Sequence, residues 1–308
     1  MNALITGVCG FLGRRLSRYL LQAGVNVIGL GTVSTSAGMP PEIEYYRTDI
    51  LNFDELDNTL HKVRERKPIV FHLAGESNVG KSRTDPLSAW SVNVTGTAHL
   101  LEACRRAMLQ QIVFPSTTLV YARLTEPPYH ETDAVQVSSV YSSTKLAAEA
   151  LIKSYSVDFG FACHIARLGN VYGPGGPTES IVGIILRQVK AGGSITLKTV
   201  SSIRDFIYCD DVASGLATLA CYPAESSFEI FNLASGVSTS IKTLAERACE
   251  VSGIETKIIE TEPQPGSAID SLAVSIERIT QQTPWRPAWK LEDGLRQTLS
   301  EMEPKNND

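Results

Sequence analysis

The feature that most constrains this chain is a glycine-rich turn between an apolar run and a helical segment near its beginning. Residues 2–6 are apolar enough for a buried parallel strand, and Gly7, Gly10 and Gly13 follow it. Residues 11–23 then show helical spacing. In this context Gly7 allows a tight turn, Gly10 lets the backbone approach a pyrophosphate, and Gly13 allows close helix–strand packing. The alternative is an ordinary strand-to-helix turn.

Strands and helices continue to alternate along the first half of the chain. The predicted strands cover residues 25–30, 69–73, 111–116 and 161–168, and the predicted helices cover 52–66, 86–108 and 140–159. This alternation predicts the α/β class, with a doubly wound parallel sheet (a Rossmann fold) covered by helices on both faces.

The pattern loosens after residues 173–177. Helical segments over 180–191, 241–251 and 291–302 are mixed with short strands, which predicts a smaller mixed α/β C-terminal region. We therefore expect a dinucleotide-binding domain over residues 1–170 and a substrate-binding region over 171–308. Segments around 203–235 are expected to return and pack on the first domain.

The composition excludes several classes of function. Of the 308 residues, 20% are charged and 43% hydrophobic, and the net charge of −5 gives no reason to expect a nucleic-acid or membrane partner. Six cysteines and five histidines are scattered without the spacing of metal ligands, so we expect neither disulfides nor a metal site. No leader peptide or membrane-spanning stretch is evident, and a cytoplasmic location is expected.

Tyr141 and Lys145 stand four residues apart in the predicted helix 140–159, so their side chains share one face. A phenol pKa of roughly 10 makes an unassisted tyrosine a poor base at neutral pH. A nearby ammonium and the positive nicotinamide ring would lower that pKa, and an N-cap at Ser138 or Ser139 would place Tyr141 near the positive helix end. With the glycine turn, this pair predicts hydride transfer coupled to proton transfer.

A third catalytic hydroxyl is expected at the end of the predicted strand 111–116. Such a hydroxyl would bind the substrate oxygen and relay its proton to Tyr141. Ser116, Thr117 and Thr118 follow one another here, and on the residues alone the choice among them stays open.

The second predicted strand lacks the terminal carboxylate that hydrogen-bonds the 2′-hydroxyl of NAD. It runs into Gly31 and Thr32, with Ser34 and Thr35 nearby, and the first acidic residue of the chain is Glu42. NADP is therefore permitted, and the cofactor prediction is NAD(P) with a lean to NADP.

Two basic residues and one acidic residue bear on the same cofactor. Arg14 or Arg15 could pair with a 2′-phosphate, or both could be solvated charges of a helix face. Asp49 could accept a hydrogen bond from the adenine amino group or could cap the next helix, a role equally open to Asn52.

Taken together, the motifs resemble those of the extended short-chain dehydrogenase/reductases, and more narrowly the nucleotide-sugar epimerase/dehydratase group. The resemblance covers nearly the whole chain. Its motifs are Thr6-Gly7-x-x-Gly10-Phe11-Leu12-Gly13, Phe71-His72-Leu73-Ala74-Gly75, Asn93-Val94-Thr95-Gly96-Thr97, the Ser/Thr run before Val120-Tyr121, Tyr141-x-x-x-Lys145, Arg167 to Pro174, Arg204 to Val212 and Phe231 to Gly236.

The resemblance implies that Thr117 is the catalytic hydroxyl, Tyr141 the acid/base, and Lys145 the residue that lowers its pKa and binds the nicotinamide ribose. With the positions above, the candidate cofactor-binding residues are Gly7, Gly10, Phe11, Leu12, Gly13, Arg14, Thr32, Asp49, Ile50, Leu73, Ala74, Gly75, Asn93, Tyr141, Lys145 and Leu168. The candidate substrate-binding residues are Glu76, Ser77, Thr117, Thr118, Asn170 and Arg204, the last on a diphosphate. For Glu76, Ser77 and Lys81, ordinary loop polarity is an equal alternative.

The chain departs from the family pattern in three places. No carboxylate follows Thr117, so a 4,6-dehydratase is not expected. Residues 264–267 lack the family's arginine and aspartate, and residues 198–203 replace the usual glycine- and aspartate-containing turn before Arg204. The last two departures weaken the assignment of the nucleotide more than that of the redox chemistry.

The expected function is NAD(P)-dependent hydride transfer at a sugar carbon, chiefly C4 of a nucleotide sugar, with a lean to 4-keto-sugar reduction. The alternatives are a 4-epimerase with retained NAD, a dehydrogenase of a nucleotide-free sugar or polyol, and a non-catalytic dinucleotide-binding regulator. The resemblance also implies a homodimer formed through residues 87–108 and 140–159, although apolar residues there could equally face the core.

Overall fold

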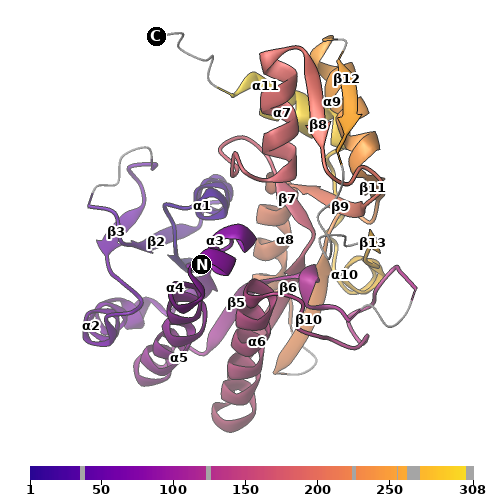
Figure 1. Cartoon of the computed structure of the whole chain (residues 1–308). Coiled ribbons are helices and arrows are strands. Elements are labelled where there is room, and N and C mark those ends of the chain that lie inside the picture. The colour runs from indigo at the N-terminus through magenta and orange to yellow at the C-terminus, as the bar shows by residue number, and fades with distance from the viewer. Residues whose placement is uncertain (35–38, 123–125, 224–226, 255, 262–270, 303–308) are drawn as a thin grey trace.

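The structure is a computed structural model that describes residues 1–34, 39–122, 126–223, 227–254, 256–261 and 271–302 (Figure 1). Thr35 and residues 264–267, both used above, lie outside the described residues. None of the described helices is both long and apolar enough to cross a membrane.

A seven-stranded sheet forms the centre of the molecule, and all its strand pairs are parallel. From one edge to the other its strands are β10 (Phe228–Leu233), β6 (Ala162–Leu168), β5 (Gln111–Thr117), β4 (Ile69–His72), β1 (Asn2–Thr6), β2 (Asn26–Gly31) and β3 (Glu44–Arg47). The direction of winding reverses between β1 and β4, and in such sheets ligands bind beside that reversal. The predicted fold class is confirmed.

Helices cover both faces of this sheet (Figure 1). On one face α1 (Phe11–Gln22) and α8 (Cys209–Cys221) pack together, and on the other α2 (Phe53–Val63), α5 (Gly96–Ala107) and α6 (Val140–Phe159) do so. Successive side chains of a strand therefore enter different cores: Ile5 packs with the first set and Leu4 with the second. This explains why the strands are apolar along their whole length.

The C-terminal region contains two smaller sheets. In one, β9 (Ile203–Tyr208) pairs with β11 (Ser238–Ser240), β13 (Ser271–Leu272) and β7 (Asn170–Tyr172); in the other, β8 (Ser194–Leu197) pairs with β12 (Lys257–Glu260). Its helices are α7 (Ile181–Ala191), α9 (Ile241–Ser252), α10 (Glu277–Gln282) and α11 (Leu291–Ser300). Because β10 joins the main sheet and α8 covers it, the chain returns to the first region after β9.

The helix predicted over residues 86–108 is not continuous. The structure has α4 (Pro86–Trp90), a π-helical turn over Ser91–Thr95, and then α5. A short helix that was not predicted, α3 (Val79–Thr84), precedes them. A π-helical turn holds one extra residue and is often found at functional sites. Here it contains Asn93, whose contacts are described below.

Candidate active site

The candidate site lies where the strands of the main sheet reach their carboxyl ends. Chain segments that follow neighbouring parallel strands meet at one edge of the sheet. The predicted positions found there are Gly7 after β1, Thr32 after β2, Asp49 and Ile50 after β3, Leu73 to Ser77 after β4, Thr117 and Thr118 at the end of β5, and Leu168 and Asn170 at the end of β6.

The glycine turn has the geometry of a cradle for an anion. Gly7 has a φ of +68°, and a Cβ there would lie 2.7 Å from the Ala74 nitrogen. A Cβ on Gly13 would lie 2.3 Å from the Gly7 oxygen, so neither position accepts a side chain. Gly10 is the N-cap of α1, with no side-chain cap and no acidic residue in the first turn. The amide groups of this helix end are therefore open to a pyrophosphate, and the residues fit a dinucleotide.

Phe11 and Leu12 pack away from this turn. Both contact the C-terminal core, and the Phe11 ring lies against Gly176. They therefore join α1 to the C-terminal region.

The two arginines in the first turn of α1 differ in their surroundings. Arg15 is half-buried: its Nη2 donates to the Pro174 oxygen (3.0 Å), and its guanidinium faces Asp210 and Glu301 at 3.8 and 3.6 Å. Arg14 is exposed, and its Nε donates to the Cys9 oxygen (2.9 Å). Of the two, Arg14 is placed beside the glycine turn.

After β3, the structure shows which of the two candidate residues, Asp49 or Asn52, caps the next helix. Asn52 caps α2 by accepting from the amide of Glu55. Asp49 accepts from the amide of Leu51 (2.9 Å) and stays exposed, so it is available to an adenine. Ile50 is buried and packs against Gly96 of α5.

The loop after β4 is held by buried hydrogen bonds. The Thr6 hydroxyl accepts from the Ala74 amide (3.1 Å) and contacts His72 Nδ1 (2.8 Å). Asn93 binds Glu76 through both main-chain groups, accepting from its amide (2.7 Å) and donating to its oxygen (3.0 Å), and also donates to the Thr144 hydroxyl (2.9 Å). The π-helical turn therefore fixes the β4 loop against α6, which carries Tyr141.

Thr117, Tyr141 and Lys145 come together between β5 and α6. The Thr117 hydroxyl lies near enough to the Tyr141 phenol to lower its pKa, and Lys145 Nζ donates to the Pro115 oxygen (2.8 Å). Ser139 is the N-cap, in a reciprocal capping box with Ser142, which places Tyr141 in the first turn of α6.

The pKa of Tyr141 differs from the value expected for a tyrosine beside a lysine. Burial raises the pKa of Tyr141 to about 12, although the hydrogen bond from Thr117 opposes the rise. Burial lowers the pKa of Lys145 to about 8, and Glu149 opposes that change. The expected lowering of the tyrosine pKa is thus absent from the protein alone, because desolvation of the phenol dominates. The phenol is protonated at neutral pH.

The three competing hydroxyls have different partners. Ser116 donates to Glu149, which also forms a buried ion pair with Arg167 (2.8 Å). Thr118 is buried in the turn that follows β5. Of the three hydroxyls, that of Thr117 is the one that lowers the pKa of Tyr141. Glu149 was missed in the sequence, although its position four residues after Lys145 in a helix is a signal of contact.

The candidate substrate-binding residues lie on several separate segments of the chain. Glu76 forms an ion pair with Lys81 (2.6 Å), and its charge raises the pKa of Tyr141. Ser77 is exposed. Asn170 begins β7 and pairs with Phe206 of β9, while Arg204 lies two residues earlier on β9 and donates to the Ile203 oxygen (2.7 Å).

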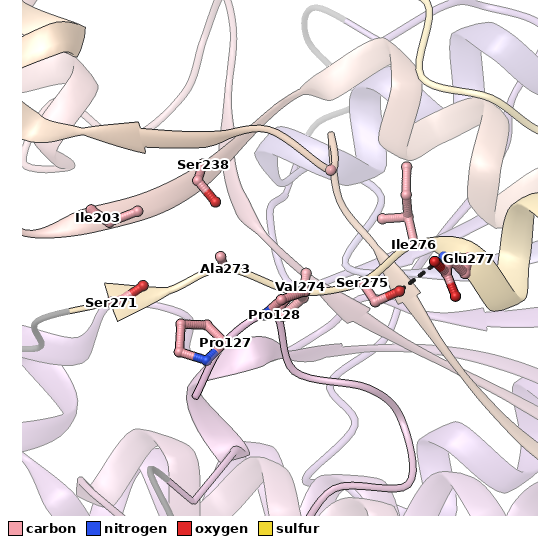
Figure 2. A pocket seen from close by; sticks show the side chains of 11 residues that line it. Pro127, Pro128, Ile203, Ser238, Ser271, Ala273, Val274, Ser275, Ile276 and Glu277 are labelled. Carbon is pink, nitrogen blue, oxygen red and sulfur yellow. Dashed lines mark hydrogen bonds between the residues drawn. The ribbon is translucent and has the colours of Figure 1, made fainter. Parts of the chain in front are cut away.

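A cavity of about 450 Å³ lies elsewhere, next to β9 and β13. Figure 2 shows the segment through Ser271 and Ala273 between Ile203 and the Pro127–Pro128 turn. None of the three candidate catalytic residues (Thr117, Tyr141 and Lys145) lines this cavity.

Comparison with known proteins agrees with this geometry. A sequence model of the NAD dependent epimerase/dehydratase family matches residues 3–234. The chain is 30% identical to the UDP-glucose 4-epimerase of Mycolicibacterium smegmatis, with 97% of each chain covered. It is 27% identical to the GDP-6-deoxy-D-mannose reductase of Pseudomonas aeruginosa, covering 97% of this chain and 96% of the relative. The UDP-glucose 4-epimerase of Thermus thermophilus, solved with NAD, superposes with a TM-score of 0.87 at 28% identity, with 98% of each chain covered.

Proposed function

The chain belongs to the NAD dependent epimerase/dehydratase family of extended short-chain dehydrogenase/reductase enzymes, and we propose that it reduces a 4-keto group of a nucleotide-linked hexose with NADPH. The observation that carries the proposal is the buried pair of Thr117 and Tyr141 beside Lys145, with the phenol held in its protonated form. A protonated phenol is the form that donates a proton to a ketone oxygen.

A dinucleotide held by the glycine turn would supply the hydride that the carbonyl carbon accepts. Tyr141 donates its proton to the oxygen of the same carbonyl, and Thr117 hydrogen-bonds that oxygen. Lys145, with a pKa of about 8, is cationic at neutral pH and stabilises the phenolate that forms. The ketone becomes an alcohol, and NADPH becomes NADP⁺.

Two features support NADPH over NADH as the consumed cofactor. No carboxylate ends β2, and Arg14 lies beside the glycine turn without a carboxylate partner among the described residues. A guanidinium is well suited to bind a phosphate. In this proposal residues 1–170 hold the dinucleotide and residues 171–308 bind the sugar nucleotide.

A 4-epimerase with retained NAD is the second candidate, because the relative from Mycolicibacterium smegmatis at 30% identity is named as one. It would use the same three residues and return the hydride to the opposite face of the sugar. Dehydration is disfavoured because Thr118 and Leu119, rather than acids, follow Thr117.

The test is a panel of nucleotide sugars and nucleotide-linked 4-keto sugars, with and without NADPH, followed by nicotinamide absorbance and product identification. Net NADPH consumption is the expected result. Tyr141→Phe should then reduce turnover by about 10²–10⁴-fold, whereas Tyr155→Phe, on the same helix, should not. Stereoisomer interconversion without net consumption would establish the epimerase instead, and full activity of Tyr141→Phe would remove the proposed acid.

We also propose that the protein is a homodimer formed through α4, α5 and α6. Large apolar side chains are exposed on these helices, including Leu87, Trp90 and Val157, with 79%, 41% and 72% of their surface accessible. Exposed apolar surface of this kind commonly marks an interface.

A further inference from the structure

Two guanidinium groups flank the end of β2, and the sequence motifs single out only one of them. Arg47 is the last residue of β3 and lies opposite Gly31 of β2 in the parallel register. Its Nε donates to the Thr32 oxygen (3.3 Å), just as Arg14 Nε donates to the Cys9 oxygen (2.9 Å). Each arginine is therefore anchored by its Nε to a carbonyl of a loop that borders the cofactor cradle.

This anchoring leaves the terminal nitrogens of both arginines available. Both side chains are exposed, and neither forms an ion pair within the described part of the chain. Other arginines differ in this respect: Arg15 faces Asp210 and Glu301, and Arg66 pairs with Glu44. The region around β2 thus presents positive charge without a neutralising carboxylate.

Arg47 lies on the same side of the sheet as the glycine turn. Its charge acts on the phenol of Tyr45, which donates to the Val33 oxygen (2.8 Å). A Cβ placed on Gly31 would lie 3.2 Å from that phenol oxygen and 3.1 Å from Cys9 Sγ. Arg47, Tyr45 and the Cys9 turn therefore surround the end of β2 together.

We infer that Arg47 and Arg14 form a binding site for the 2′-phosphate of NADP(H), with Arg47 as the specificity-determining residue. The inference rests on the proposed function, because it requires a dinucleotide on the glycine turn. In this fold the adenosine ribose lies at the end of the second strand, where a carboxylate selects NAD and an arginine accommodates NADP. A phosphate dianion can accept charge-assisted hydrogen bonds from two guanidinium forks, and β2 does not end in a carboxylate that would repel it.

The test is the dissociation constant of NADPH and of NADH for the full-length protein, measured by calorimetry without any sugar. Arg47→Ala should weaken NADPH binding at least about tenfold, because the 2′-phosphate would lose its charge-assisted hydrogen bonds to that guanidinium. NADH binding should change less than about twofold. Arg18→Ala is the matched control: it removes an exposed charge from α1 one turn beyond Arg14 and should affect neither ligand.

Two further variants sharpen the result. Arg14→Ala should show the same selective loss, and Arg47→Lys should recover part of the NADPH affinity because it keeps the charge but loses the planar fork. Equal losses for NADPH and NADH in Arg47→Ala, or tighter NADH binding by the unaltered protein, would overturn the inference and leave the hydride-transfer proposal intact. Failure of the unaltered protein to bind either dinucleotide would instead overturn the proposed function, and the inference with it.

Discussion

His72 illustrates how single buried residues support this site. Its ring nitrogens contact the hydroxyls of Thr6 and Thr97 at 2.8 and 2.9 Å, and Thr6 in turn holds the amide of Ala74. Burial lowers the pKa of His72 to about 3, and the nearby Lys145 charge contributes to the shift. The neutral imidazole of His72 therefore helps to hold the loop that follows β4.

A pH dependence of stability follows from this residue. Because the folded-state pKa lies below the unfolded value of roughly 6.5, the unfolded chain binds the extra proton between those values, and stability falls as the pH falls. Titration of His72 should lower the free energy of unfolding by up to about 1.4 kcal/mol for each unit by which the pH falls between 6.5 and about 3. Urea unfolding across that range should give a shallower pH slope for His72→Gln.

His130→Gln is the matched control, because the His130 side chain is exposed. It should reproduce the slope of the unaltered protein. Equal slopes for all three proteins would show that the pKa of His72 is the same in the folded and unfolded states.

At the scale of elements, α6 carries the proposed catalytic residues Tyr141 and Lys145, and local sequence signals define both of its ends. Ser139 and Ser142 cap the beginning reciprocally, and Gly160 ends the helix with a φ of +71°. Both signals are local, which is why the helix over 140–159 could be predicted with its bounds.

The cap makes a quantitative prediction for this helix. Ser139→Ala removes the acceptor of the Ser142 amide and should lower the free energy of unfolding by about 1 kcal/mol. Ser154→Ala, in the exposed part of the same helix, should change it by less than about 0.5 kcal/mol. Urea unfolding of both variants provides the measurement, and comparable losses would argue against the capping role.

Other elements depended on contacts that no local pattern contains. The interruption of the 86–108 helix places Asn93 against Glu76 and Thr144, which are distant in sequence. Periodicity alone therefore suggested one continuous helix. The same limit applied to Ser116, Thr117 and Thr118. The partner of Ser116 is Glu149, 33 residues away, so the residues alone left the choice among the three hydroxyls open, and only the family resemblance pointed to Thr117.

At the scale of the whole molecule, the doubly wound parallel sheet could be predicted because β–α alternation leaves few topologies. The role inferred for Arg47 could not, because it depends on the register of β3 against β2. The C-terminal sheets are formed by strands as short as two or three residues, and such strands carry little periodic signal.

The proposed dimer is tested at this scale. Light scattering should give twice the 33.4 kDa mass of one chain. Ala150→Glu places a charge on the exposed face of α6 and should shift the mass toward the monomer, whereas Lys242→Ala, on the distant α9, should not. A monomeric mass for the unaltered protein would refute the interface.

Helix α1 contacts both halves of the molecule. Its first turn opens onto the anion cradle, while Arg15 and Phe11 from the same turn reach Pro174 and Gly176. Any adjustment of this helix on dinucleotide binding must therefore act on the half proposed to bind the sugar. Thermodynamic linkage then makes the effect reciprocal. If the bound dinucleotide raises the affinity for the sugar by some factor, the bound sugar raises the affinity for the dinucleotide by the same factor.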